Sequence, residues 1–204
     1  MQIHGNFYPM ELWLIRHGET LWNREQRAQG QLDVPLSGLG LEQAEKLAKR
    51  LQHTKFDCIV SSDLQRAYRT AEIVAARLEL PILSSTAWRE IHMGIGQGLT
   101  YSEIFLHKHV RPIDQAWEDG ESKADVMNRV AVALLELYSQ FAGSRVAVFS
   151  HGGAIRGAIH VLLNDLNQHI DFAERGNTSI SKLEVKVGNV GRLLVYNDTA
   201  PLEG

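Results

Sequence analysis

Side chains suited to phosphate chemistry follow three short apolar runs of this sequence. They are Arg16 and His17 after the first run, Arg66 after the second and His151 after the third. A guanidinium presents a planar fork that matches phosphate oxygens, and a neutral imidazole can accept a phosphoryl group. A second, protonated imidazole can donate to an oxygen of that group, and a helix opening at Gly152 would favour an anion. These residue types predict a phosphoryl-transfer site.

A phosphate ester also needs a proton for its leaving group, and Glu90 is the candidate donor. Its carboxyl group stands in the stretch that follows a short apolar run at 81–83, and carboxyl groups commonly act as general acids. Taken singly, each of these residues has an ordinary alternative, such as a packed histidine, a salt bridge at a helix start or a surface carboxylate. Their recurrence after successive apolar runs favours one common site.

The elements that would hold these residues alternate between strand and helix. Four short apolar runs predict strands, at 11–16, 57–61, 81–83 and 145–150. Four stretches with apolar residues at helical spacing predict helices, at 37–51, 63–78, 122–141 and 152–163. Ser37 is an expected N-cap, as is Ser122 with Asp125 in an S-x-x-D pattern, while Leu41 and Tyr68 are expected on buried helix faces. The alternation predicts an α/β protein, a three-layer α/β/α sandwich with a mostly parallel central sheet, whose ligand lies beyond the carboxyl ends of the strands.

Two parts of the chain depart from this alternation. Apolar and charged residues alternate over 183–187 and a second run follows at 192–196, which predicts a C-terminal hairpin at the sheet edge. Residues 91–120 fit neither pattern, apart from a short helix near 100–107, and we expect a small insertion or lid over the active site. The whole chain, 1–204, is expected to be a single domain in which residues 1–10 are flexible.

Composition restricts the class of partner. Of 204 residues, 44% are hydrophobic and 22% are charged, as in ordinary globular domains, and the net charge of −3 gives no reason to expect nucleic acid or an anionic membrane. No apolar run approaches the ~20 residues that span a bilayer, and residues 1–10 lack the features of a secretory signal. The single cysteine, Cys58, excludes an intramolecular disulfide, so we expect a cytoplasmic protein. A homodimer is compatible with the sequence, which does not define the oligomeric state.

The ordered motifs resemble one known family. The segment Arg16-His17-Gly18-Glu19-Thr20, with Trp22-Asn23 after it, resembles the signature of the histidine phosphatase superfamily, the phosphoglycerate-mutase-like proteins. Further motifs follow in the order of that family: Gln29-Gly30, Gly40 with Gln43-Ala44, Ser61 to Ala71, Arg89-Glu90-Ile91 with Gly94, Gly120-Glu121-Ser122, and Ser150-His151-Gly152-Gly153. The resemblance therefore covers roughly residues 11–160 and favours the phosphatase branch.

The resemblance implies a role for each candidate residue. His17 is the nucleophile that becomes phosphohistidine, and Glu90 protonates the leaving oxygen and then activates water. Catalytic roles are implied for His17, Glu90, His151, Arg16 and Arg66. Binding of the phosphoryl oxygens is implied for Arg16, Asn23, Arg66, His151 and Gly152. The implied partner is a small phosphorylated metabolite, and neither a metal nor another cofactor is implied.

One segment departs from the family pattern, and three functions stay open. Where the acid loop of the family often continues Gly-x-Trp-Glu-Gly, this chain has Gly94-Ile95-Gly96-Gln97-Gly98, so substrate preference cannot be carried over. The main prediction is a metal-independent phosphomonoester phosphatase, a phosphoric monoester hydrolase. The alternatives are a phosphoglycerate mutase and a non-catalytic phospholigand-binding module. The short stretch from Glu90 to Gly120 disfavours the mutase, and the pair His17 and Glu90 disfavours the binding module.

Overall fold

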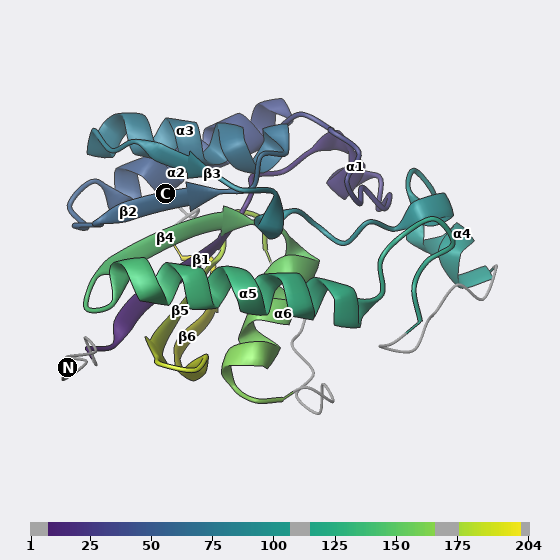
Figure 1. Cartoon of the computed structure of the whole chain (residues 1–204). Coiled ribbons are helices and arrows are strands. Elements are labelled where there is room, and N and C mark those ends of the chain that lie inside the picture. Colours follow the sequence, from purple (N-terminus) through teal and green to yellow (C-terminus); the bar gives the residue numbers. More distant parts are fainter. Residues whose placement is uncertain (1–7, 107–114, 166–175, 201–204) are drawn as a thin grey trace.

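The computed structural model describes residues 8–106, 115–165 and 176–200, and a six-stranded sheet in the order β3-β2-β4-β1-β5-β6 forms its centre (Figure 1). The four parallel strands are β1 (Met10–Arg16), β2 (Cys58–Ser61), β3 (Ile82–Ser84) and β4 (Arg145–Ser150). The two remaining strands are β5 (Ile180–Lys186), antiparallel to β1, and β6 (Val190–Asp198), antiparallel to β5. The mostly parallel sheet and the C-terminal hairpin at its edge are thus confirmed.

Helices cover both faces of the sheet and complete three layers (Figure 1). On one face lie α2 (Gly38–Leu51) and α3 (Gln65–Leu78), and on the other lie α5 (Lys123–Phe141) and α6 (Gly152–Leu162). This arrangement confirms the predicted α/β/α sandwich. Within the described ranges, none of the helices combines the length and the apolar character needed to span a bilayer.

Alternate residues of β1 face two separate cores. Leu12 and Leu14 pack in the core shared with α5 and α6, whereas Trp13 and Ile15 pack in the core shared with α2 and α3. Successive side chains of a strand point to opposite faces, so a strand with helices on both sides must be apolar at every position. This double burial is why the predicted parallel strands read as continuous apolar runs in the sequence.

The two predicted N-caps are confirmed. Ser37 Oγ accepts a hydrogen bond from the backbone N–H of Gly40 at 3.0 Å, which begins α2. Ser122 Oγ accepts from Asp125 N–H at 3.0 Å while Asp125 Oδ2 accepts from Ser122 N–H at 2.8 Å, a reciprocal capping box that begins α5. These caps fix the start of each helix next to a loop that faces the carboxyl ends of the strands.

Some local predictions are wrong. Leu41 is 39% exposed and Tyr68 is 36% exposed, because smaller residues one position away, Gly40 and Ala67, are buried instead. Three short elements lack any readable periodicity and were not predicted: α1 (Leu21–Arg24), η1 (Thr86–Trp88) and η2 (Gly94–Gly96).

The predicted insertion and the predicted flexible start are described only in part. The short helix expected near 100–107 is α4 (Tyr101–Leu106), and the rest of the insertion is described except for residues 107–114. Figure 1 places α4 and α1 on the same side of the molecule, and an isolated bridge pairs Arg27 with Thr100. Residues 1–7 lie outside the described residues, whereas Met10 is fully buried and begins β1, so the predicted flexibility does not extend to Met10.

The loop after β1 packs backbone to backbone against α2. A Cβ added to Gly18 would lie 2.5 Å from the carbonyl oxygen of Gly40, and a Cβ added to Gly40 would lie 2.0 Å from that of Glu19. Gln43 Oε1 accepts from Glu19 N–H at 2.8 Å, and Ser37 N–H donates to Glu19 O at 2.8 Å. The motif around Gly40 and Gln43, one of those that resemble the family, therefore holds the loop that follows His17.

Replacing Gly40 with alanine should destabilise the protein. The added Cβ overlaps a backbone oxygen that cannot swing away, so Gly40→Ala should lower the free energy of unfolding by about 1–3 kcal/mol. Gly38→Ala is the matched control in the same helix, because nothing lies within 4 Å of its added Cβ. It should leave stability unchanged or raise it by up to about 1 kcal/mol, since alanine favours helix. Urea denaturation of both variants measures the difference, and equal stabilities would contradict the close contact.

Candidate active site

A cavity of about 690 Å³ opens at the carboxyl ends of the parallel strands, and His17 lines it. The ring of His17 is only 3% exposed, and its Nδ1 lies 2.7 Å from the carbonyl oxygen of Gly18. A carbonyl oxygen can only accept, so Nδ1 carries the proton and Nε2 keeps its lone pair. Burial, followed by the charges of Arg66 and Arg16, holds the pKa of His17 well below 6.5. The ring is therefore neutral and nucleophilic at neutral pH.

Two guanidinium groups stand beside this ring. Arg16 ends β1, and Arg66 lies in the first turn of α3 with its side chain almost fully buried. Arg66 Nη1 donates to Leu32 O at 2.8 Å and Nη2 donates to Gly30 O at 2.7 Å. Burial lowers the pKa of Arg66 to about 10, so the group keeps its charge at neutral pH. The buried Nε of Arg66 has no hydrogen-bond acceptor within the described residues.

His151 packs beside His17 and is not among the residues that line the cavity. The ring centroids are 5.2 Å apart, and His151 is fully buried at the end of β4. Its Nε2 is 2.9 Å from Ser62 Oγ, which also accepts from Leu64 N–H. Burial first, then the charge of Arg66, hold the pKa of His151 well below 6.5, which favours a neutral ring over the protonated imidazole expected from the sequence. A neutral ring that accepts the Ser62 hydroxyl proton at Nε2 still carries a donor at Nδ1.

The carboxylate of Glu90 sits on the N-terminus of α6. Oε2 accepts from Gly153 N–H at 3.0 Å, and Oε1 accepts from Ala154 N–H at 3.2 Å and Ile91 N–H at 2.9 Å. A Cβ added to Gly153 would lie 2.3 Å from Oε1, so glycine at this position permits the close approach. The glycine pair predicted to bind an anion thus has two functions, since Gly152 lines the cavity and Gly153 holds the carboxylate.

Asn23 and Gly152 lie where the sequence predicts them. Asn23 Oδ1 accepts from Thr20 N–H at 3.0 Å, from Thr20 Oγ1 at 3.1 Å and from Asn177 Nδ2 at 3.3 Å. The amide is oriented by these bonds, which leaves Nδ2 as its donor toward the cavity. Six of the predicted residues therefore line one cavity, and the seventh, His151, packs against one of them, His17. The six are Arg16, His17, Asn23, Arg66, Glu90 and Gly152.

Sequence reasoning missed several lining residues. They are Gln26, Gln29, Ile91, Met93, Tyr101, Arg156 and Asn177. Arg156 carries a signal that could have found it, because it lies four residues after Gly152 and so on the same face of α6. Asn177 carries none, because it reaches the site only through the antiparallel pairing of β5 with β1, where its Nδ2 donates to His17 O at 3.1 Å.

The segment that departs from the family pattern braces the site from one side. Gln97 Oε1 accepts from Gln31 N–H at 2.7 Å, and a Cβ added to Gly30 would lie 2.2 Å from that oxygen. The ring of Trp117 occupies the space above Gly96, where an added Cβ would lie 2.6 Å from it. An aromatic ring from elsewhere in the chain thus covers the glycine that replaces the family's tryptophan.

The histidines of the insertion do not form a metal site in the part of the chain described here. His92 Nδ1 accepts from Gly94 N–H at 3.2 Å, while His107 and His109 lie outside the described residues. Among the described residues, no group of three or more histidine, cysteine, aspartate or glutamate side chains could hold a metal ion.

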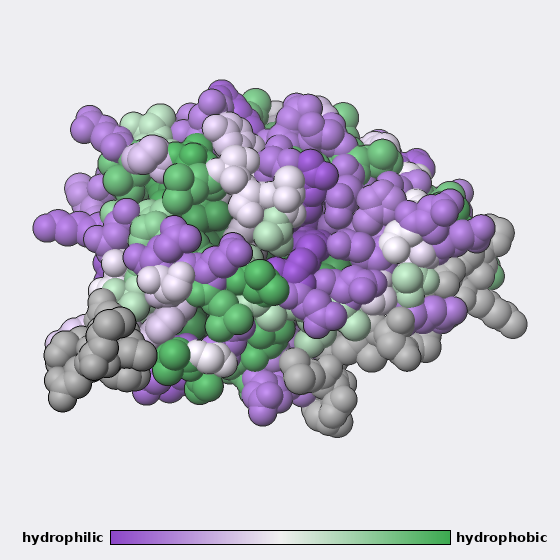
Figure 2. Space-filling view, in the orientation of Figure 1, coloured by the Kyte–Doolittle hydropathy of each residue, from purple (hydrophilic) through white to green (hydrophobic). Residues whose placement is uncertain are grey.

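Figure 2 shows a mainly hydrophilic surface on the side of the molecule that carries α4, which suits a polar ligand.

Comparisons with known proteins agree with this geometry. A family model described as Histidine phosphatase superfamily (branch 1) matches residues 12–199. The chain is 33% identical over 208 residues to Phosphoglycerate mutase-like protein 4 of Arabidopsis thaliana, which covers 95% of this chain and 87% of that protein.

Two phosphatases are among the similar solved structures. A mycobacterial glucosyl-3-phosphoglycerate phosphatase in complex with VO3 is 32% identical, with a TM-score of 0.85 over 93% of this chain and 99% of that chain. A mutant phosphoserine phosphatase from Entamoeba histolytica in complex with phosphoserine is 30% identical, with a TM-score of 0.80 over 94% of this chain and 98% of that chain. Another structure of that phosphatase contains 3-phosphoglyceric acid.

The two buried imidazoles should make the folded protein sensitive to mild acid. In the unfolded chain both rings titrate near ~6.5, whereas in the folded chain their pKa values lie well below this. The unfolded state therefore binds more protons below about pH 6.5, so stability is lost as the pH falls, by up to about 1.4 kcal/mol per pH unit for each ring. Urea denaturation between about pH 7 and pH 5 measures this slope. The double variant His17→Gln/His151→Gln should show a shallower slope, and parallel curves would contradict the prediction.

Proposed function

Since the chain belongs to the histidine phosphatase superfamily and is a phosphoric monoester hydrolase, we propose that it hydrolyses small phosphorylated metabolites through a phosphohistidine at Nε2 of His17. One observation carries the proposal. The Nδ1–H of His17 donates to Gly18 O, which directs the free lone pair of Nε2 at a ligand in a cavity lined by Arg16 and Arg66. A neutral nucleophile between two guanidiniums suits a phosphoryl group.

In the first step, Nε2 of His17 attacks the phosphorus and the bond between phosphorus and the ester oxygen breaks. The carboxyl group of Glu90 gives its proton to the leaving oxygen, so the product departs as an alcohol. In the second step, a water molecule attacks the phosphorus of the phosphohistidine and gives its proton to the Glu90 carboxylate. The phosphorus–nitrogen bond breaks, and inorganic phosphate leaves with the enzyme restored.

The surrounding donors stabilise the charge on the transferred group. Arg16 and Arg66 bind its non-bridging oxygens, and Asn23 Nδ2 and the backbone N–H of Gly152 add neutral donors. His151 packs beside His17, with 5.2 Å between ring centroids, and its buried Nδ1–H, which has no acceptor among the described residues, is the proposed donor on that side of the group. Preorganised donors of this kind supply most of the rate in phosphoryl transfer, so the proposed mechanism uses no metal and no cofactor.

A mutase is the second candidate, because the Arabidopsis relative is named phosphoglycerate mutase-like. A mutase would form the same phosphohistidine and return the group to a bound hydroxy acid instead of water. The phosphatase neighbours support hydrolysis as the first candidate.

Three further statements stay predictions from the sequence. They are a cytoplasmic location, a single domain over 1–204 and the absence of nucleic-acid and membrane partners.

The cavity also favours substrates with a second anionic group. Arg156 lines it from α6 and is a third guanidinium there, while Glu90 is the one carboxylate among the described lining residues. The neighbouring phosphatases are named for, or hold, phosphoserine, 3-phosphoglyceric acid and a glucosyl-3-phosphoglycerate, each of which combines a phosphate with a carboxylate. We therefore propose a small phosphorylated acid as the substrate class, with Arg156 as the partner of its carboxylate.

Replacing the nucleophile should abolish turnover and labelling of the protein. His17→Ala should leave less than about one part in a thousand of wild-type phosphate release, because no other group replaces Nε2. Wild-type protein quenched within a turnover should carry an acid-labile phosphohistidine, and activity should persist in EDTA. His53→Ala, at an exposed histidine of another loop, is the control and should keep full activity. Residual labelling of the His17→Ala variant would exclude His17 as the nucleophile.

Removing the third guanidinium should select between substrates. Arg156→Gln should lower kcat/KM for phosphoserine or 3-phosphoglycerate by about tenfold and that for p-nitrophenyl phosphate by less than about twofold, since only the acids carry a second anion. Arg69→Gln removes one exposed guanidinium from α3 and controls for net charge. Equal losses on all substrates would reject the carboxylate contact. Interconversion of 2- and 3-phosphoglycerate without phosphate release would establish the mutase instead.

A further inference from the structure

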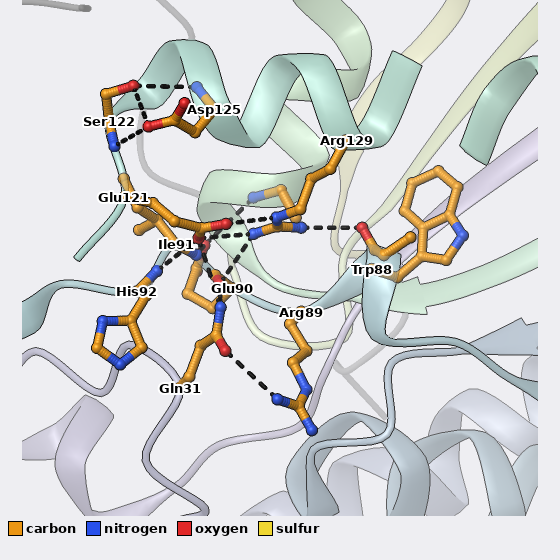
Figure 3. Close-up of polar contacts among 12 residues, drawn as sticks. Gln31, Trp88, Arg89, Glu90, Ile91, His92, Glu121, Ser122, Asp125 and Arg129 are labelled. Carbon is orange, nitrogen blue, oxygen red and sulfur yellow. Dashed lines mark hydrogen bonds and ion pairs between the residues drawn. The ribbon is translucent and has the colours of Figure 1, made fainter. Parts of the chain in front are cut away.

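We infer that Arg129 and Glu121 are positioning residues for Glu90, and that their ion pair fixes the loop from which this carboxylate reaches the site. The inference rests on the proposed role of Glu90 as proton donor. Neither residue is among the described residues that line the cavity, so neither is placed to contact a substrate there. Figure 3 shows Arg129 reaching from α5 between Glu121 and the segment that carries Glu90.

Every nitrogen of the Arg129 guanidinium donates to Glu121 or to the loop that carries Glu90. Nε donates to Glu121 Oε1 at 2.8 Å and Nη2 donates to Glu121 Oε2 at 3.1 Å, which makes a two-pronged ion pair. The same Nη2 donates to the carbonyl oxygen of Glu90 at 3.0 Å, and Nη1 donates to that of Ala87 at 2.8 Å. The guanidinium therefore ties the backbone of the loop at two points, three residues apart.

Glu121 holds the other side of the same loop. Its Oε2 accepts from the backbone N–H of His92 at 2.8 Å and from Gln31 Nε2 at 3.4 Å (Figure 3). Burial raises the pKa of Glu121, but the hydrogen bonds from Arg129 and His92 outweigh it, so the pKa lies below its usual value and the carboxylate stays charged. The capping box at Ser122 fixes the backbone next to Glu121, so the ion pair of Glu121 and Arg129 is anchored to the start of α5.

Glu90 is held at two ends: α6 binds its carboxylate, and Arg129 binds its backbone carbonyl. Its carboxylate is bound by backbone N–H groups of α6, and its carbonyl oxygen accepts from Arg129 and from Gln31 Nε2 at 3.0 Å. The loop has no strand partner at this point, because β3 ends at Ser84. Without Arg129, the loop backbone loses two of its bonds to the scaffold while the carboxylate keeps only its contacts at α6.

Gln31 links this support to the phosphate-binding side of the cavity. Its neighbours Gly30 and Leu32 supply the two carbonyl oxygens that hold Arg66, while its own side chain holds the carbonyl of Glu90. The proton donor and a phosphate-binding guanidinium thus share one segment of backbone. A small displacement of the loop would change the distance between the carboxyl group and the leaving oxygen, and proton transfer is steeply sensitive to that geometry.

The alternative is that the ion pair of Arg129 and Glu121 only stabilises the fold. Comparing substrates with good and poor leaving groups distinguishes this alternative from a positioning role. If Arg129 acts through Glu90, its loss should matter most where the leaving group needs a proton. Arg129→Met should lower kcat for an alkyl phosphate by about tenfold and kcat for p-nitrophenyl phosphate by less than about threefold, with KM little changed. Glu121→Gln should shift the same ratio in the same direction, and Arg129→Lys should restore part of it.

Arg145→Met is the matched control. Arg145 also pairs with a carboxylate, Glu11 Oε2 at 2.9 Å, and also donates to a backbone carbonyl, Lys55 O at 3.2 Å, but it stands at the amino end of β4, away from the cavity. Its loss should lower stability in urea denaturation without changing the ratio of the two substrates. Should Arg129→Met fail to fold, Glu121→Gln tests the same change in the ratio.

The decisive comparison repeats the substitution in a Glu90→Gln background. There Arg129→Met should cost less than about a further twofold on the alkyl phosphate, because the group that it positions can no longer donate. Independent, multiplicative losses, or equal losses on both substrates, would overturn the inference while leaving the proposed function intact. If Glu90→Gln itself shows no dependence on the leaving group, the proposed role of Glu90 fails and the inference fails with it.

Discussion

Positive charge buried beside two imidazole rings is the constraint on which this site depends. Arg66 is held in the interior by hydrogen bonds to two carbonyl oxygens, Gly30 O and Leu32 O, and not by a carboxylate. Because these partners carry no full negative charge, the site retains its cationic field, and that field together with burial keeps His17 and His151 neutral. In the proposed mechanism a phosphoryl dianion binds opposite these cations and meets Nε2 of His17 with its lone pair available. Binding and activation then have one electrostatic cause.

Glycine permits an unusually close approach to the backbone at two points of the site. At Gly18 and Gly40 the loop after β1 lies against α2, which fixes the direction in which the carbonyl of Gly18 meets the His17 ring. At Gly153 the carboxylate of Glu90 lies against the first turn of α6. A side chain at any of these three glycines would therefore overlap the backbone where the loop after His17 meets α2, or the carboxylate of Glu90.

The sequence was sufficient to predict whatever depends on strand order and on the positions of strand ends. His17, Arg66 and His151 could be assigned to one place because each follows a strand buried on both faces, and the topology of parallel strands then brings these ends together. Asn177 could not be assigned, because its approach depends on the pairing of β5 with β1. Trp117 and Arg129 could not be assigned either, since their contacts join segments that share no periodic pattern. Burial on helix faces was predicted only in part, because at Leu41 and Tyr68 the helical spacing admits a neighbouring, smaller residue.

The two imidazoles show why residue type alone does not decide a role. Both are buried and both are neutral without ligand, so charge does not distinguish them. Their second hydrogen-bond partners do. The carbonyl of Gly18 can only accept, which places the proton of His17 on Nδ1 and leaves Nε2 as a nucleophile. The hydroxyl of Ser62 can donate, which lets Nε2 of His151 accept and leaves Nδ1–H as a donor. Both rings therefore carry their hydrogen on Nδ1 and differ at Nε2. In His151 this nitrogen is occupied by the Ser62 hydroxyl, whereas in His17 it is the atom that the proposed mechanism uses as the nucleophile.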